Sequence, residues 1–273
     1  MRVWCNGAVL EDPTAAAIRV DDHGLTVGDG VFEAVKVVDG RPFALTRHLD
    51  RLTSSAAGLG LPRPDVEEIR AAVSEVCIGQ DLSLGRLRIT WTAGPAPLGS
   101  GRGGGPPTLV VVAAPMAAAS PTTSVVRVPW VRNERSPVAG LKTTSYAENV
   151  VALAYAAERG ASEALFANTV GDLCEGTGSN VCYVVDGEVR TPTLASGCLA
   201  GVTRALVLEW CGVREIDEPF SVLDRAEEIF LVSTTRDVQP VGRLDDRDLP
   251  APGPLTLQAM KTWTAREAEG IDP

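Results

Sequence analysis

The sequence predicts a mixed α/β fold of the α+β class, arranged in two domains. Short runs that interleave apolar and polar residues, such as Val31–Val38, are typical of strands with one buried face. Runs with apolar residues three and four apart, such as Leu49–Leu59, are typical of amphipathic helices. The composition changes over Pro115–Pro121, which is alanine-rich with a proline at each end. We therefore expect a small N-terminal domain over residues 1–115, a linker over 116–121 and a larger C-terminal domain over 122–273.

The composition favours a globular protein that does not bind nucleic acid. A chain of 273 residues with 45% apolar residues can bury a large core. Its formal net charge of -10 argues against a nucleic-acid partner, because a phosphate backbone attracts basic surfaces. No apolar run reaches the roughly 20 residues that span a bilayer, and the first residues do not resemble an export signal. We expect a cytoplasmic protein with no membrane span.

The six cysteines and two histidines show no metal-ligand spacing. No Cys-x-x-Cys pair is present, and no histidine neighbours a cysteine. We therefore expect buried free thiols in a reducing compartment, and no metal ion. Cys174 is the candidate for thiol reactivity, because it directly precedes Glu175.

Two β-hairpins are predicted near the N-terminus. Met1–Leu10 alternates around Asn6-Gly7, and Val31–Val38 is joined through Asp39-Gly40 to the next short run. Both pairs of turn residues favour a tight hairpin. Gly28-Asp29-Gly30 precedes the second hairpin and allows two interpretations: a simple turn into the strand, or a close approach of another group to the backbone.

Two helices follow the second hairpin. The first is predicted to begin at Thr46, with Thr46 as its N-cap, and the second covers Val66–Cys77. The first helix carries Arg47, Asp50 and Arg51, which could form a solvated, ion-paired face. Alternatively, one of these arginines could bind phosphate, because the planar guanidinium fork suits that anion.

The next predicted strand, Gly85–Thr92, places two arginines in its middle. A period of two puts Arg86 and Arg88 on one face and apolar residues on the other. Such arginines usually face solvent, but in a cleft a guanidinium would bind a substrate carboxylate. The Gly- and Pro-rich stretch Gly94–Pro107 is predicted as a long loop, which function often explains, and Thr108–Ala114 as an apolar strand.

Strands and helices are mixed in the C-terminal part. The predicted strands are Val125–Val131, Ala164–Ala167, a hairpin over Val181–Val189, Ile229–Thr235 and Val238–Val241. The predicted helices run from Ser145 to Gly160, from the opening run Gly197–Arg204 to Gly212, and from Thr256 to Glu269. Lys142 is expected at a junction where a strand ends and a helix starts.

Lys142 and Glu175 are the candidates for chemistry. An amine nucleophile together with a carboxylate that can hold a positive ring nitrogen is the minimum chemistry of a pyridoxal phosphate (PLP) site. Each residue also has an ordinary explanation, as a helix-start lysine and a loop carboxylate. Gly201-Val202-Thr203 at a helix start and Ser233-Thr234-Thr235 at a strand end could bind a phosphate, although a plain helix cap also explains the first.

Six short motifs occur in an order and spacing that resembles the fold-type IV PLP enzymes, the class IV aminotransferases. They are Gly28-Asp29-Gly30-Val31-Phe32-Glu33, His48-Leu49-Asp50-Arg51-Leu52, Lys142 with Tyr146 and Asn149, Glu175-Gly176 with Ser179-Asn180-Val181, Gly201-Val202-Thr203-Arg204, and Ser233-Thr234-Thr235 with Pro240-Val241. The resemblance covers nearly the whole chain. It implies an N-terminal α/β sandwich domain and a larger, β-barrel-like C-terminal domain with helices.

The resemblance implies a role for each matched residue. Lys142 would carry PLP as a Schiff base and then move the proton of the substrate. Glu175 would pair with the pyridine nitrogen, and Tyr146 would bind the phenolic oxygen of the cofactor. The residues implied for the phosphate site are Arg51, Gly201, Val202, Thr203, Ser233 and Thr234. The family also implies amino acid and keto acid substrates and a homodimer whose active site borrows a loop from the partner.

The substrate is expected to be a D-amino acid. The run Gly28–Val37 resembles D-amino-acid aminotransferases more than branched-chain enzymes. It departs from them at Phe32, where a tyrosine is usual, and at His23, where an arginine is usual. Thr92-Ala93-Gly94 also lacks the arginine expected to hold the substrate carboxylate. Arg88 with Lys36 is the replacement hypothesis, and Phe32, Thr235 and His23 complete the predicted substrate site.

Two alternatives remain open. Aminodeoxychorismate lyase resembles this chain closely and uses the same lysine and cofactor to release 4-aminobenzoate and pyruvate, although Lys36 stands where many lyases have arginine. A catalytically idle PLP-binding scaffold is the other, and the presence of both Lys142 and Glu175 argues against it.

Overall fold

A computed structural model describes all residues from 1 to 273 and divides them into two compact units. Unit 1 comprises Met1–Ala118, Leu141–Ser145 and Ile271–Pro273. Unit 2 comprises Ala119–Gly140 and Tyr146–Gly270. The short segment that carries Lys142 therefore belongs to unit 1, although the chain on both sides of it belongs to unit 2.

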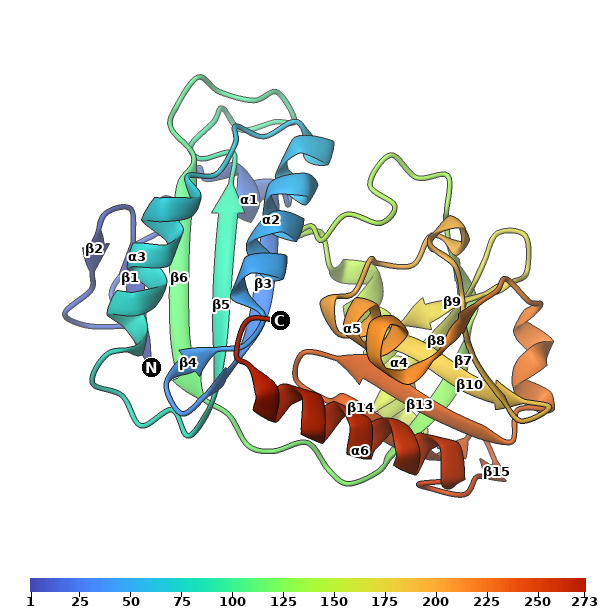
Figure 1. Cartoon of the computed structure of the whole chain (residues 1–273). Helices are drawn as coiled ribbons and strands as arrows, with labels where there is room; N and C mark the ends of the chain where they lie inside the picture. The colour runs from blue at the N-terminus through green and yellow to red at the C-terminus, as the bar shows by residue number, and fades with distance from the viewer. The chain divides into compact units, whose positions relative to one another are not determined.

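Unit 1 is built on a six-stranded antiparallel sheet with the order β2-β1-β6-β5-β3-β4 (Figure 1). The strands are β1 (Arg2–Cys5), β2 (Ala8–Val9), β3 (Gly30–Val38), β4 (Arg41–Pro42), β5 (Leu84–Thr92) and β6 (Thr108–Pro115). Asn6 and Asp39 adopt positive φ angles of 44° and 49° in the two tight turns. Both predicted hairpins are therefore confirmed, as are the strands around the two arginines and after the glycine-rich loop.

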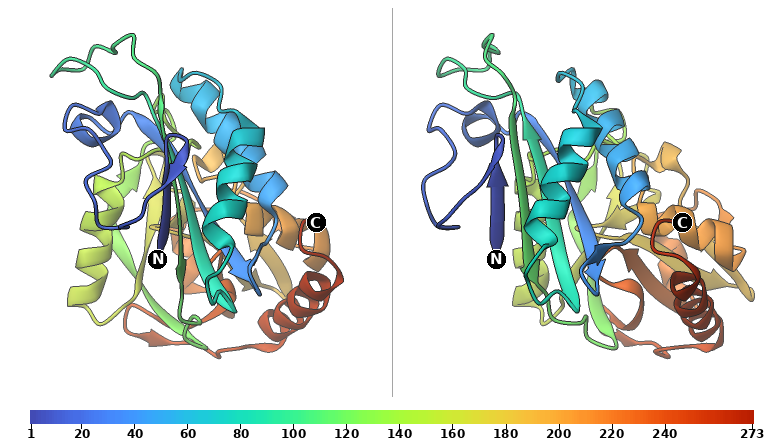
Figure 2. Two further views of the ribbon diagram at one scale, coloured as in Figure 1. Left: turned by 90° about the vertical axis from the view of Figure 1, so that its left-hand side faces the viewer. Right: turned by 60° about the vertical axis from the view of Figure 1, so that its left-hand side comes forward.

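Helices α2 (Leu45–Leu59) and α3 (Val66–Cys77) cover one face of this sheet (Figure 2). Their apolar stripes pack onto the alternate strand residues that face them, so one continuous core forms. Core members from the strands include Val31, Val35, Leu87, Ile89 and Val111. The remaining helix of unit 1, α1 (His23–Thr26), is a single turn capped by Asp22.

The start of α2 differs from the prediction. Thr46 is not the N-cap: the helix begins at Leu45, and Ala44 occupies the cap position with a left-handed backbone and no side-chain cap bond. Asp272 provides the cap instead. Its carboxylate accepts hydrogen bonds from Thr46 N at 2.9 Å and Thr46 Oγ1 at 2.6 Å. The sequence did not indicate this cap because its donor and acceptor are 226 positions apart.

The prediction that Lys142 lies at a strand-to-helix junction is wrong. Strand β7 (Thr123–Arg132) ends ten positions earlier, and α4 (Ala147–Glu158) begins five positions later. Residues 142–144 instead pair antiparallel with the free edge of β3: Phe32 N donates to Lys142 O at 3.0 Å, and Thr144 N donates to Gly30 O at 2.8 Å. This edge is available because β4 pairs only with the far end of β3.

Unit 2 contains a nine-stranded mixed sheet that curls around its own core (Figure 1). The strands are β7 (Thr123–Arg132), β8 (Glu163–Asn168), β9 (Leu173–Gly176), β10 (Asn180–Val185), β11 (Glu188–Thr191), β12 (Arg214–Glu215), β13 (Glu228–Ser233), β14 (Asp237–Leu244) and β15 (Arg247–Asp248). Strand β7 runs parallel to both β8 and β14, and most other pairs are antiparallel. The core includes Leu165, Val181, Tyr183 and Leu231, all fully buried.

Three helices complete unit 2. They are α4 (Ala147–Glu158), α5 (Val202–Cys211) and α6 (Pro254–Glu269), with short 3-10 turns at Leu194–Ser196 and Phe220–Asp224. Helix α4 packs on β7 and β8, and α6 packs on α5 and β14, where the rings of Trp210 and Trp263 lie 5.2 Å apart. Every strand and helix predicted for this part of the chain is present, with ends that differ by a few residues. No helix is long and apolar enough to cross a membrane.

The long-range cap of α2 leads to a prediction about stability. Replacing Asp272 with Ala should lower the free energy of unfolding by about 1 kcal/mol, because it removes an N-cap carboxylate. Urea denaturation measures the change. Asp246→Ala is the matched control, since Asp246 is exposed and should tolerate the same loss of charge. Equal stability of the two variants would contradict the capping role of Asp272.

Candidate active site

The side chain of Lys142 lies over an aromatic ring in unit 1. The edge pairing places Lys142 directly opposite Phe32, so the two side chains share a face of the sheet. Lys142 Nζ is 4.4 Å from the centroid of the Phe32 ring. The backbone N–H of Lys142 also donates to Ser55 Oγ of α2 at 3.2 Å. Strand pairing, helix contact and ring contact together fix where this amine lies.

Arg88 contacts the same ring. Its Cζ lies 3.9 Å from the centroid of Phe32, and its Nε is 3.2 Å from Thr90 Oγ1. The Arg88 side chain is otherwise exposed, as predicted for this face of β5. Because both cations approach one ring, their separation cannot exceed the sum of the two ring distances. An amine and a guanidinium thus contact the same aromatic ring.

Lys36, the other predicted substrate residue of this face, is more enclosed. It is only 4% exposed, and its Nζ lies 5.3 Å from the centroid of the Phe43 ring. Lys36 stands directly across from Arg86 in the register of β3 and β5. The face therefore carries four cationic side chains, Lys142, Arg88, Lys36 and Arg86, which favours anionic ligands.

Arg51 lies on the opposite, helix-covered face, in a buried ionic cluster with Glu33 and His48. Arg51 donates to Glu33 through Nε at 2.8 Å and Nη2 at 2.6 Å, and His48 Nδ1 is 2.7 Å from Glu33 Oε2. Burial alone would raise the pKa of Glu33, but the charge and hydrogen bonds of Arg51, with the hydrogen bond of His48, outweigh it and lower the pKa to about 2. Glu33 is thus an anion at neutral pH, and it fixes the direction of the Arg51 guanidinium.

His23, predicted to bind substrate, is 1% exposed and has both ring nitrogens engaged. Nδ1 is 3.0 Å from Asp29 Oδ2, and Nε2 is 2.8 Å from the carbonyl oxygen of Gly99. The hydrogen bond with Asp29 raises the pKa of His23. In this structure His23 therefore contacts the glycine-rich loop rather than an open surface.

In unit 2, Glu175 is held between a backbone amide and an arginine. Its Oε2 accepts from Leu199 N at 2.9 Å, and its Oε1 lies 3.3 Å from Arg132 Nε. The carboxylate is only 13% exposed. Arg132 also hydrogen-bonds the side chain of Asn149 and lies over the ring of Phe166. These contacts fix the orientation of the Glu175 carboxylate.

Tyr146 and the turn after Glu175 are tied to a second buried carboxylate, Glu163. Tyr146 Oη donates to Thr177 O at 3.3 Å. Glu163, 1% exposed, accepts from Thr177 N at 2.9 Å, from the Thr177 hydroxyl and from Ser179 Oγ at 3.1 Å. Burial raises the pKa of Tyr146, so its phenol stays protonated at neutral pH and able to donate.

The start of α5 has the features of an anion cradle. Its first backbone N–H groups have no helical partners, and Gly201 stands at the N-cap without a side-chain cap. A Cβ on Gly201 would collide with Asn180 Oδ1, so only glycine fits this close approach. The buried Ser233 Oγ, at the end of the neighbouring β13, has no hydrogen-bond partner in the protein. Orphan amides and an orphan hydroxyl are the donors that a phosphate group needs, and thus fit PLP.

The remaining predicted residues lie around this cradle. Val202 and Thr203 form the first turn of α5, and Thr203 is buried. Thr234 and Thr235 are half-buried in the turn between β13 and β14. All the predicted phosphate residues except Arg51 thus belong to unit 2.

The expectation that Cys174 is reactive is wrong. Cys174 is 1% exposed, and burial together with the nearby Glu175 charge raises the pKa of its thiol far above the usual range. A carboxylate neighbour disfavours the thiolate rather than activating it. The thiolate is the reactive form, so we expect Cys174 to be inert.

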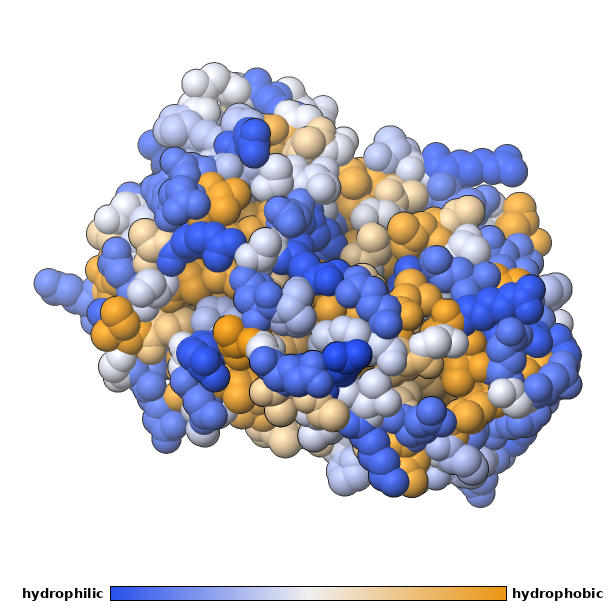
Figure 3. Space-filling view, in the orientation of Figure 1, coloured by the Kyte–Doolittle hydropathy of each residue, from blue (hydrophilic) through white to orange (hydrophobic).

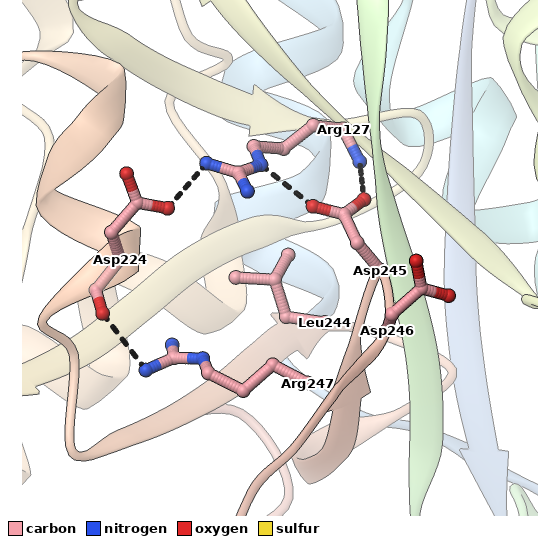
Figure 4. A pocket seen from close by; sticks show the side chains of 6 residues that line it. All are labelled: Arg127, Asp224, Leu244, Asp245, Asp246 and Arg247. Carbon is pink, nitrogen blue, oxygen red and sulfur yellow. Dashed lines mark hydrogen bonds and ion pairs between the residues drawn. The ribbon is translucent and has the colours of Figure 1, made fainter.

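A separate surface pocket of unit 2 offers no unpaired arginine (Figure 4). Arg127 binds Asp245 at 2.7 Å and Asp224 at 2.6 Å, and Arg247 donates to the carbonyl oxygen of Asp224 at 3.0 Å. Both arginines of the pocket are thus already hydrogen-bonded within the protein.

Sequence reasoning missed the supporting residues Glu163 and Arg132, and it gave Glu33 no role beyond its motif. Glu33 carried a visible signal, since an acid amid the apolar residues of a strand is rare without a partner. Glu163 and Arg132 carried none, because their partners are fixed only by the fold.

The fold is that of fold-type IV transaminases. The fold IV transaminase CpuTA1 from Curtobacterium pusillum matches this structure with a TM-score of 0.84 and 34% identity, over 96% of this chain and 92% of that chain. Related sequences have several names. A Methanocaldococcus jannaschii protein provisionally named a branched-chain-amino-acid aminotransferase is 33% identical over 90% of this chain and 89% of its own length. A bifunctional aminodeoxychorismate lyase / D-amino acid transaminase of Mycobacterium tuberculosis is 30% identical over 92% of this chain and 93% of its own length.

The sequence profile described as amino-transferase class IV matches residues 30–244. The chain therefore belongs to the class IV aminotransferase family, whose members depend on PLP. The matched range contains all the cofactor-binding residues predicted from the sequence.

The buried Glu33 cluster leads to a prediction about acid stability. Glu33→Gln should lower the free energy of unfolding by about 3 kcal/mol at neutral pH, because it leaves Arg51 without its counter-charge. The folded pKa of Glu33 is depressed from its ordinary value of 4.5 to about 2, so this stabilisation is fully present above the unfolded value and is lost as the pH falls toward 2.

Urea denaturation at several pH values measures this effect. The stability difference between the parent protein and Glu33→Gln should shrink as the pH falls below about 4.5. The control is Asp21→Asn, which removes a carboxylate from the exposed pair with Arg19 and should have little effect. A stability difference independent of pH would contradict the ionised state of Glu33.

The cradle at α5 leads to a prediction about cofactor affinity. Gly201→Ala should weaken PLP binding about tenfold or more, a loss of roughly 1.4 kcal/mol, because the new Cβ displaces Asn180 or the start of the helix. Titration of the apo protein with PLP, followed by absorbance, gives the affinity. Gly178→Ala is the matched control, since a Cβ there meets nothing closer than 3.9 Å. Unchanged affinity in Gly201→Ala would remove this helix start from the phosphate site.

Proposed function

We propose that this protein is an aminotransferase that moves an amino group between a D-amino acid and a 2-keto acid. The observation that carries the proposal is the shared contact of Lys142 Nζ and Arg88 with the ring of Phe32. A guanidinium binds a carboxylate through two parallel hydrogen bonds, and the amine beside it can then reach the Cα of the same molecule. An α-amino acid carries its carboxylate and its amino group on the same Cα, so one substrate presents a partner to each side chain.

Each predicted residue has a role in this proposal. Bound PLP supplies an aldehyde that condenses with amines and a ring that withdraws electrons from Cα. Lys142 holds that cofactor covalently and, once displaced, carries the proton at Cα. Glu175 holds the proton of the ring nitrogen, with Arg132 and Leu199 N keeping its carboxylate in place. Tyr146 donates to the phenolic oxygen.

The phosphate of PLP is assigned to the α5 cradle and to Arg51. The assigned residues are Arg51, Gly201, Val202, Thr203, Ser233 and Thr234. The buried Glu33 directs the Arg51 guanidinium and balances part of its charge. Arg88, Lys36, Phe32 and Thr235 are assigned to the substrate, and His23 to the support of the adjacent loop.

The D-amino acid is supported by the sequence of β3 and by one of the relatives. The run Gly28–Val37 resembles D-amino-acid aminotransferases, and the Mycobacterium tuberculosis relative bears that activity in its name. The Methanocaldococcus jannaschii relative favours a branched-chain substrate instead. A spectral titration separates the two: D-alanine or D-glutamate should abolish the visible absorption band of bound PLP, while L-valine and L-leucine should leave it unchanged. The reverse result would overturn the D-specific proposal.

Aminodeoxychorismate lyase is the second candidate, favoured by the other activity in the name of the Mycobacterium tuberculosis relative. The substrate of a lyase also carries a carboxylate and an amine, so the Phe32 contacts suit it as well. Incubation with aminodeoxychorismate decides between the two. Formation of 4-aminobenzoate and pyruvate, with no spectral response to D-amino acids, would establish the lyase.

The carboxylate-binding role of Arg88 is testable by substitution. Arg88→Leu should raise the KM for amino acids about tenfold or more, because it removes charge-assisted hydrogen bonds worth roughly 1.5–3 kcal/mol, while the PLP absorbance stays unchanged. Arg86→Leu is the matched control, since Arg86 lies on the same strand face two positions away. If both variants keep the parent KM, Arg88 does not bind the substrate.

We further propose that the protein is a homodimer. Helix α4 exposes Val150, Val151 and Leu153 at 65%, 53% and 43%, and Trp130 on the adjacent β7 is 45% exposed. Exposed apolar residues grouped on one helix are typical of protein interfaces. Hydrophobic and hydrophilic residues are interspersed on the face drawn in Figure 3. A second copy of this chain is the proposed partner of α4.

Light scattering tests the role of this helix. Val150→Glu with Val151→Glu should shift the mass from dimer to monomer, because two buried charges without partners destabilise an interface. Val170→Glu, at an exposed valine outside α4, should leave the dimer intact. A dimer that survives the double substitution would place the interface elsewhere.

A further inference from the structure

The glycine-rich loop over residues 94–107 is held by a single arginine, Arg102. The guanidinium of Arg102 donates to Asp29 through Nε at 2.7 Å and through Nη2 at 2.6 Å. It also donates to the carbonyl oxygens of Leu59 and Gly60 at 2.7 Å each. One side chain thus joins the loop to the entrance of β3 and to the C-terminal end of α2, where a cation is favourable.

The tip of this loop has few other restraints. Residues 97–106 are all exposed, and five of them are glycines. The only other hydrogen bond from a side chain to the tip comes from His23, whose Nε2 is 2.8 Å from Gly99 O. His23 and Arg102 meet on the same carboxylate, Asp29, which is only 10% exposed. Without these contacts the glycines would give the tip a large conformational entropy.

Asp29 also lies beside the backbone that positions Lys142. Its neighbours Gly28 and Gly30 present the carbonyl oxygens that accept Thr144 Oγ1 at 2.9 Å and Thr144 N at 2.8 Å. Gly28 approaches Ser145 so closely that a Cβ there would collide with Ser145 Oγ. The position of Asp29 is therefore coupled, through two glycine carbonyls, to the strand-like segment that carries the lysine.

We propose that Arg102, Asp29 and His23 form a clasp that fixes the glycine-rich loop and, through the backbone on both sides of Asp29, the placement of Lys142. Arg102 is a positioning residue in this arrangement. When the clasp opens, the loop tip becomes free and the contacts of residues 142–145 with β3 loosen. The part of this inference that concerns Lys142 rests on its proposed attachment to PLP, and the part that concerns the loop does not.

Limited proteolysis of the full-length protein tests the clasp directly. Trypsin must take the Arg102 side chain into its own pocket, which four hydrogen bonds prevent in the closed loop. Asp29→Asn should accelerate cleavage after Arg102 about tenfold or more, since it removes the charge that this guanidinium binds. Fragments of residues 1–102 and 103–273, identified by mass spectrometry, report the cut. Asp246→Asn is the control for the lost charge.

A second variant keeps the test valid if Asp29→Asn does not fold. Arg102→Gln changes a partly exposed side chain and leaves the buried Asp29 in place. It should accelerate chymotrypsin cleavage after Leu98, which is 86% exposed at the loop tip, and Arg102→Lys should restore only part of the protection because lysine lacks the planar fork. Two results together would overturn the clasp. Trypsin would cut Asp29→Asn after Arg102 at the parent rate, and chymotrypsin would cut Arg102→Gln after Leu98 at the parent rate.

The coupling to Lys142 needs a separate measurement. The pH midpoint of the visible absorption of bound PLP reports the surroundings of the lysine nitrogen. Arg102→Gln should shift this midpoint by about 0.5 pH unit or more, whereas Asp246→Asn should not. A faster cut with an unmoved midpoint would overturn the coupling. Neither readout uses substrate turnover, so a protein that is inactive on D-amino acids would contradict the proposed function alone.

Discussion

The pairing of residues 142–144 with the free edge of β3 is the interaction on which the candidate site in unit 1 depends. Two backbone hydrogen bonds place Lys142 opposite Phe32. All else on that sheet face follows from the register: Arg88 lies diagonally across from Phe32, and Lys36 four positions further along β3. A shift of one residue would turn the lysine toward the helix-covered face. Backbone pairing thus sets the position of Lys142, and side-chain contacts only refine it.

Each unit contains a fully buried carboxylate that orients functional groups around it. Glu33 fixes Arg51 and His48 in unit 1, and Glu163 fixes the turn of Thr177 and Ser179 in unit 2. Neither carboxylate faces solvent, so their hydrogen bonds are formed before any ligand arrives. Pre-formed donors and charges of this kind spare the protein the reorganisation that binding would otherwise require.

Much of the fold could be predicted from local patterns. The turns Asn6-Gly7, Asp39-Gly40 and Asp186-Gly187 marked three hairpins, because their residues tolerate positive φ angles. The errors arose where contacts with distant parts of the chain determine the local structure. Asp272 caps a helix that starts at Leu45, and the segment of Lys142 pairs with β3. No pattern in the neighbouring sequence indicates either contact.

The candidate site shows the same division. Short motifs identified the family, and the family implied which residues bind the cofactor. This was possible because the motif residues occur in a fixed order and spacing. The roles of the supporting residues, such as Glu163 and Arg132, depend on which strands lie next to one another in the fold. The misjudged reactivity of Cys174 has a related cause, because adjacency to Glu175 in sequence gave no information about its burial.

The burial of the cysteines has a practical consequence. Burial raises the pKa of all six thiols, and none of them is exposed. At neutral pH the parent protein should therefore be nearly silent toward maleimide dyes. A single cysteine introduced on the surface would be labelled selectively without removing any native one. Spin labels or fluorophores could then follow distances in a chain that is otherwise unmodified.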